Sequence, residues 1–179
     1  MRGGSMSRSK PPRRKYRPRD IVNDPLAVAL HRAAKPSRQD RADVLAPLQQ
    51  AIKALRQGQA TEQQWSIAAG ALAVAQAIER QGVVRGLAGH LQTAELTLQA
   101  IHDRALRTGG GRWMRVTLYF GEIDALTTFE ECHTFQLNQL GRAELLQAID
   151  AAARDIKADG HTVTLVHDTT TLNDHRMAA

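Results

Sequence analysis

Among the residues of this sequence, the basic side chains near the start of the chain indicate a binding chemistry most directly, by their type and their close spacing. Eight Lys or Arg residues and no acid occur in the first nineteen positions, whereas positions 20–179 hold 16 basic and 18 acidic residues. Closely spaced cations neutralise phosphates, and a tyrosine ring among them stacks on a base. We therefore predict a nucleic-acid-binding arm. Its residues are Arg8, Lys10, Arg13, Arg14, Lys15, Tyr16, Arg17 and Arg19.

We expect this arm to attract the backbone of DNA or RNA without reading a base sequence. Base discrimination requires a structured element in a groove, and no predicted helix is conspicuously basic. The alternative is a solvated tail that promotes solubility or attracts any polyanion. A helix-turn-helix across the turn at 58–61 is disfavoured, because its second helix becomes mostly Ala and Leu after Ser66.

Other chemically capable residues are too few or too scattered to predict an active site. Glu130 and His133 form one Glu-x-x-His spacing, half of a di-iron bundle motif, and the chain has no second one. We expect His133 to be a partly buried helix residue with a local hydrogen bond, and Cys132 to be inert. No catalytic residue, metal site or cofactor is predicted, and hence no enzymatic activity. Metal-capable side chains without a fixed ligand spacing near the C-terminus are His161, His167, Asp168, Asp174 and His175.

A run of three glycines at 109–111 precedes Arg112, Trp113 and Arg115. The glycines lack the spacing and the Lys-Ser/Thr ending of a P-loop, so they predict a hinge. The three residues after them would extend a nucleic-acid surface by charge and stacking. The favoured alternative is that Trp113 anchors a packed linker, residues 113–120, to the core.

Apolar spacing predicts an all-α bundle of five or six helices that must carry these residues. A short helix is expected from Asp24, and a second after Ser37, either kinked at Pro47 or starting just before it. The third, from a Thr61 cap to Gly82, is predicted to be central because apolar residues nearly encircle it. Three more are expected over 87–107, from 121 to 140, and from 142 to a stop at 160.

The chain divides into a disordered basic arm (1–20), a helical bundle domain (21–159) and a loose C-terminal tail (160–179). Like charges and prolines without apolar partners disfavour structure in the arm. Weak alternation at 161–166 allows a short strand in the tail. A single cysteine excludes internal disulfides and fits a cytoplasmic location, and no segment is apolar enough to span a membrane. Residues 1–5 read as an expression leader or as translation from a start upstream of Met6.

The segment 15–19 (Lys-Tyr-Arg-Pro-Arg), the Asn23-Asp24-Pro25 turn, the Trp65 helix and the striped helix after it resemble small uncharacterised proteins encoded by proteobacterial prophages and plasmids. The resemblance covers residues 10–140. It implies an accessory protein of a mobile element and supplies no site residues.

Two functional hypotheses follow from the residues and the resemblance together. The first is a non-enzymatic phage or plasmid accessory protein that associates with nucleic acid through its arm, with the bundle as a scaffold or homodimerisation unit. The alternative is a protein-interaction module that binds and modulates an acidic host or defence protein.

Overall fold

The computed structural model describes residues 29–30 and 33–158, and this part of the chain is entirely helical and irregular, without a strand. Its five labelled helices are α2 (Arg38–Arg56), α3 (Glu62–Gln81), α4 (Ala88–Thr108), α5 (Phe120–Gln139) and α6 (Arg142–Ala158). The predicted all-α bundle is confirmed. The predicted arm, the C-terminal tail and its strand lie outside the described residues, as does most of the short helix expected from Asp24.

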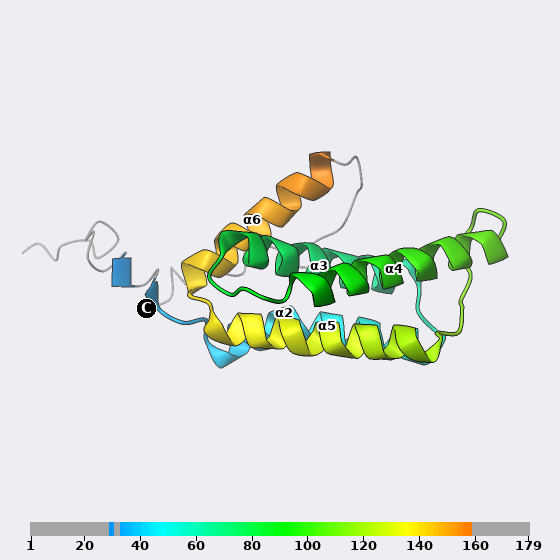
Figure 1. Cartoon of the computed structure of the whole chain (residues 1–179), viewed down its shortest axis with the longest axis horizontal. Helices are drawn as coiled ribbons and strands as arrows, with labels where there is room; N and C mark the ends of the chain where they lie inside the picture. Colours follow the sequence, from blue (N-terminus) through cyan, green and yellow to red (C-terminus); the bar gives the residue numbers. More distant parts are fainter. Residues whose placement is uncertain (1–28, 31–32, 159–179) are drawn as a thin grey trace, which may run out of the picture.

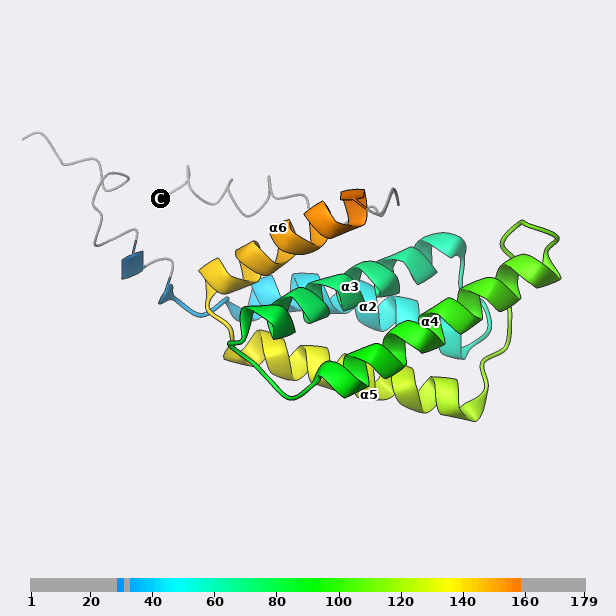
Figure 2. The ribbon, with the colours of Figure 1, turned by 45° about the horizontal axis from the view of Figure 1, so that its top comes forward.

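Helices α2 to α5 form a four-helix bundle in which each helix runs antiparallel to the one before it (Figures 1 and 2). Contacts of α2 and of α4 with both α3 and α5 close the four helices into a ring. Helix α6 leaves this ring and packs along α3 (Figure 2). Because α3 contacts each of the other four labelled helices, it is the central helix that the sequence predicts.

Side-chain caps fix where the first two labelled helices begin. The Ser37 hydroxyl accepts the Asp40 N–H while the Asp40 carboxylate accepts the Ser37 N–H, and Thr61 and Gln64 form the same reciprocal pair. Helix α2 is continuous through Pro47, so the interpretation that it starts just before this proline is wrong. The capping box at its first turn offsets the hydrogen bond that the proline removes.

Two apolar clusters fill the interior. The larger lies among α2, α3, α4 and α5, and the smaller joins the C-terminal halves of α3 and α5 to α6. Small residues on α3 allow its neighbours to approach closely, which fits the low aromatic content. Those buried on α3 are Ala68, Gly70, Ala75 and Ala77.

The bundle therefore has two distinct ends, which we call the linker end and the α6 end. At the linker end, α2 terminates and the α4–α5 linker, residues 109–119, turns the chain back (Figure 1). At the α6 end, the segment before α2 meets the start of α6, where the Arg142 N–H donates to the Ala34 carbonyl at 2.9 Å. Among the described helices, none combines the length and the apolar character that crossing a bilayer requires.

Candidate nucleic-acid interface

The predicted site residues between Arg8 and Arg19 lie outside the described residues. The described body is nearly balanced in charge, since residues 33–158 carry 14 basic and 13 acidic side chains. The basic and acidic residues are not evenly distributed over this part of the chain. From Arg104 to Gly121 the sequence has four arginines and no acid, and this run forms the last turn of α4, the linker and the start of α5.

The linker follows its path because of its three glycines. A Cβ on Gly109 would lie 1.9 Å from the Arg112 carbonyl oxygen, and Gly110 and Gly111 have φ of 61° and 92°. Side chains at these positions would collide or be strained. The helix expected over 87–107 does end just before these glycines, and the reason is a close backbone approach combined with left-handed geometry.

Trp113 anchors the linker to the bundle. Its indole N–H donates to the Ala60 carbonyl at 2.9 Å, and its ring centroid lies 6.2 Å from that of Trp65 and 6.1 Å from that of His102. The Trp65 indole N–H donates in turn to the Leu98 carbonyl. The favoured interpretation of Trp113 as an anchor is confirmed, because its ring is occupied in the protein's own packing.

A bidentate ion pair fastens the far side of the linker. Arg104 donates from Nη1 and Nη2 to the two carboxylate oxygens of Glu122 at 2.8 and 2.7 Å, and the Tyr119 N–H donates to the same carboxylate. The hydrogen bond to Glu122 raises the pKa of Arg104, which burial opposes. Burial alone would raise the pKa of Glu122, but the bonds from Arg104 and Tyr119 outweigh it and lower that pKa.

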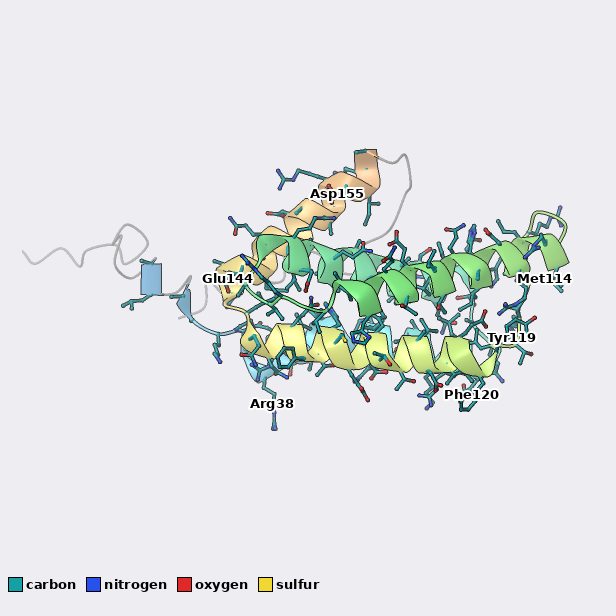
Figure 3. The ribbon with its side chains drawn as sticks, in the orientation of Figure 1. Arg38, Met114, Tyr119, Phe120, Glu144 and Asp155 are labelled. Atoms are coloured by element: carbon teal, nitrogen blue, oxygen red, sulfur yellow. The ribbon has the colours of Figure 1, made fainter. Side chains whose placement is uncertain are left out.

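Three large apolar side chains remain exposed at the same end. Met114, Tyr119 and Phe120 retain 48%, 65% and 80% of their accessible surface. Met114 and Tyr119 lie in the α4–α5 linker, and Phe120 is the first residue of α5 (Figure 3). The Arg104 guanidinium carbon lies 4.5 Å from the centroid of the Tyr119 ring. Arg112 and Arg115, on either side of Trp113 and Met114 in the same linker, are exposed as well, and within the described residues neither forms an ion pair.

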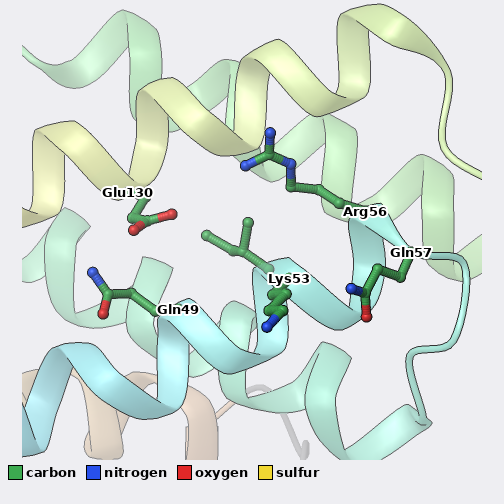
Figure 4. A pocket seen from close by; sticks show the side chains of 6 residues that line it. Gln49, Lys53, Arg56, Gln57 and Glu130 are labelled. Carbon is green, nitrogen blue, oxygen red and sulfur yellow. The ribbon is translucent and has the colours of Figure 1, made fainter.

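A shallow polar hollow of about 270 Å³ lies between α2 and α5 (Figure 4). Arg56 from α2 and Glu130 from α5 face it, yet no ion pair joins them. Four of the five polar residues around it are exposed. Its Lys53 and Arg56 are exposed to solvent, so their charges are not desolvated in the way that activates a catalytic group. Its lining residues are Gln49, Ile52, Lys53, Arg56, Gln57 and Glu130.

The two residues of the Glu-x-x-His motif on α5 lie in different environments. Glu130 faces the hollow, while His133 is completely buried, so the expectation that it is only partly buried is wrong. Its Nδ1 lies 3.3 Å from the Gln136 Oε1, and the Gln136 amide donates to the Ala75 carbonyl of α3. The predicted local hydrogen bond is confirmed, but its buried partner was not foreseen. Burial lowers the pKa of His133 to about 4.

The remaining alternatives gain no support from the described residues. No three metal-capable side chains gather among residues 33–158, and the C-terminal histidines lie outside that range. Burial, followed by the charges of Glu131 and Glu79, raises the pKa of the Cys132 thiol, which keeps it protonated. Helices α2 and α3 lie side by side along the bundle, unlike the steep crossing of a helix-turn-helix (Figure 2).

The sequence drew attention to Arg112 and Arg115 at this end and favoured Trp113 as an anchor, but it gave no sign that Tyr119 and Phe120 are exposed there. The acid-free run 104–121 is the signal that would have found them, because four arginines without an acid mark this whole segment as cationic. Comparisons with protein-family models, with curated proteins and with solved structures found no match to this chain.

Proposed function

We propose that this protein is a non-enzymatic accessory protein that binds nucleic acid through the basic residues between Arg8 and Arg19, with the helical bundle as their scaffold. The observation that carries the proposal is the separation of charge along the chain. Eight cations precede position 20, whereas the folded body is nearly neutral. A cation run without nearby acids gains most from a polyanion, because binding releases the counterions that surround the phosphates.

The bundle's own ion pairs support this division of roles. Arg80 pairs with Asp155, Arg104 with Glu122 and Arg142 with Asp40, and each pair joins two different elements of the body. These cations are engaged in holding the fold together. The proposal extends to either DNA or RNA, to a cytoplasmic site of action, and to the mobile-element origin that the resemblance implies.

Salt-dependent binding by the full-length protein tests the proposal. Replacing Arg13, Arg14, Arg17 and Arg19 by Gln removes four charges and keeps the length of the chain, while replacing the same four by Lys keeps the charge and is the matched control. On duplex DNA the Gln variant should lower the slope of log K against log salt by up to about 3.6, because each phosphate contact contributes about 0.9. The Lys variant should bind like the wild type.

Fluorescence anisotropy with a labelled duplex and a labelled single strand, between 50 and 300 mM salt, measures these slopes. Equal binding by the Gln variant and the wild type would contradict the proposal. If the wild type binds neither probe at low salt but retains one protein partner after nuclease treatment, the protein-interaction alternative replaces it.

A further inference from the structure

We infer that the exposed surface at the linker end binds a single strand of nucleic acid. This surface, which we call the linker surface, is made of Arg112, Met114, Arg115, Tyr119 and Phe120. The two aromatic rings stack on unpaired bases and the two guanidiniums contact phosphates. The inference deepens the proposed function and rests on it, since it names the form of nucleic acid that the body recognises.

Charge at the linker surface favours an anionic ligand. The two acids that flank the acid-free run are already engaged: Glu122 holds Arg104 with both of its oxygens, and Asp103 accepts the Gln99 amide at 2.9 Å. Neither therefore neutralises Arg112 or Arg115, whose guanidiniums pair with no carboxylate of the described residues. Two exposed arginines without an ion pair, three residues apart, are suited to contact successive phosphates of a flexible backbone.

The exposed rings decide between a single strand and a duplex. Tyr119 and Phe120 are adjacent in sequence, and both present their rings to solvent at the start of α5 (Figure 3). An aromatic ring gains by stacking only where a base offers an open face, and such faces are free in single strands and covered in a duplex. Arginine and aromatic side chains together form the surface that sequence-tolerant single-strand binders use.

The linker surface is held in place before any ligand arrives. Trp113 ties the middle of the linker to the α2–α3 turn, and the Arg104–Glu122 pair holds its end. The guanidinium of Arg104 also lies over the Tyr119 ring, which restricts how that ring turns. A Tyr119 ring restrained in this way loses little conformational freedom on binding, so more of its stacking energy appears as affinity.

The linker surface lies at the opposite end of the bundle from the first described residues. The described chain begins at the α6 end, where Ala34 contacts Arg142, and α2 then spans about 28 Å to the linker end (Figure 1). The basic segment before position 20 and the linker surface share no residue, so variants of each can be made and their effects on binding compared.

The test compares full-length variants on two probes, a labelled (dT)20 single strand and a 20-base-pair duplex. Phe120→Ala should weaken binding to (dT)20 about 10-fold, within the range measured for losing one stacked base, and change duplex binding less than about 2-fold. Phe135→Ala is the matched control, because Phe135 is also exposed on α5 but lies near the opposite end. It should bind both probes like the wild type.

The charge of the linker surface is tested in the same way. Replacing Arg112 and Arg115 together by Gln should reduce the salt slope on (dT)20 by about 1.4, since each single-strand phosphate contributes about 0.7. The matched control replaces the exposed Arg38 and Arg154 by Gln and should leave the slope unchanged. Thermal unfolding of each variant, followed by circular dichroism, should stay at the wild-type midpoint, because none of these side chains is buried.

The outcomes separate the inference from the proposed function. If the linker variants bind (dT)20 like the wild type while the arm Gln variant loses affinity, the inference is wrong and the proposed function stands. If the arm variant binds normally and the linker variants do not, the linker surface is confirmed and the role of the arm is wrong. An equal loss of duplex and single-strand binding by Phe120→Ala would overturn the single-strand preference. Absence of binding by the wild type overturns both.

Discussion

The two ends of the bundle differ in the charges that surround their arginines. At the α6 end, Arg80 of α3 reaches Asp155 of α6, and Arg142 of α6 reaches Asp40 of α2. At the linker end, Arg104 holds Glu122, but Arg112 and Arg115 pair with no carboxylate of the described residues. Two arginines at the α6 end therefore join one helix to another, whereas the exposed Arg38 and Arg85 there, like Arg112 and Arg115, form no ion pair within the described residues. What distinguishes the linker end is the absence of any acid between Arg104 and Gly121, whereas Asp40 and Asp43 lie next to Arg38 and Arg41 in the sequence at the α6 end.

The polar groups in the interior differ between the ends as well. Toward the linker end, both indole N–H groups of Trp65 and Trp113 donate to backbone carbonyls. In the C-terminal half of α5, toward the α6 end, His133 has a partner for Nδ1 but none for its buried Nε2. The two indole anchors carry no group that titrates, whereas His133 in the other half of the bundle does.

The largest effect is expected from acidification, which should destabilise the folded protein through His133. The unfolded chain takes up a proton on His133 near pH 6.5, whereas burial delays protonation in the folded protein to about pH 4. Protons therefore favour the unfolded state across this window, and stability should fall as the pH is lowered through it. The loss reaches about 3 kcal/mol, from a pKa difference of roughly 2.5 units. Urea unfolding at pH 7, 5.5 and 4 measures it.

His133→Asn is the control for the acid prediction. The asparagine side chain places an amide near the Nδ1 position, keeps a donor for the Gln136 Oε1 and does not titrate. This variant should lose less stability than the wild type between pH 6.5 and 4. The same loss in both proteins would assign the acid sensitivity to other groups and remove this distinction between the two ends.

Removal of the linker anchor should have the next largest effect. Trp113→Ala eliminates the hydrogen bond to Ala60 and the ring contacts with Trp65 and His102, and should cost about 2 kcal/mol, less than for a fully buried indole. Trp113→Phe keeps a ring and loses the hydrogen bond, at a cost of about 1 kcal/mol. Chemical denaturation measures both. The neighbouring exposed residue gives the control, and Met114→Ala should be neutral.

Trp113→Ala also tests whether Trp113 anchors the linker or stacks on the bases of the nucleic acid. If this variant keeps the stability of the wild type but loses binding to (dT)20, Trp113 stacks on bases and does not anchor the linker. A loss of stability with a parallel, smaller loss of binding is the expected pattern, because a loosened linker holds Tyr119 and Phe120 less firmly.

Helix positions followed directly from the sequence because local chemistry sets them. The Thr61–Gln64 capping pair, the left-handed Gly82 and the three glycines after α4 lie where their residue types predict. Pro47 was ambiguous, since a proline inside an apolar stripe fits either a helix start or an interior position. Two features of the structure place the start nine residues earlier: the Ser37 capping box begins the helix at Arg38, and Val44 and Leu45, before the proline, pack against the smaller apolar cluster.

The candidate site was less predictable because exposure depends on long-range packing. Trp113, Tyr119 and Phe120 belong to one short aromatic-rich stretch, yet the first is anchored and the other two face solvent. What separates them is the position of the Ala60 carbonyl, 53 residues away, which accepts the Trp113 indole. Complete burial of His133 likewise depends on α3, which supplies the Ala75 carbonyl for its partner Gln136. The spacing of residues along a single helix predicts neither which of these aromatic residues is exposed nor the complete burial of His133.

The smallest effects concern one ion pair from each end. Glu122→Gln at the linker end should cost about 1.5 kcal/mol, because the pair with Arg104 is bidentate and mostly buried and the carboxylate also accepts the Tyr119 N–H. Asp155→Asn at the α6 end should cost about 0.5 kcal/mol or less, since both partners are more than half exposed. Urea unfolding at pH 7 compares the two variants.

The same two substitutions should differ in their effect on binding. Glu122→Gln frees the charge of Arg104 beside Tyr119, so the salt slope on (dT)20 should rise by up to about 0.7, which corresponds to one added phosphate contact. Asp155→Asn removes one acidic charge as well, but far from the linker surface, and should leave the slope unchanged. An equal rise in both variants would mean that the net charge of the body, and not the arrangement at the linker end, governs its attraction to nucleic acid.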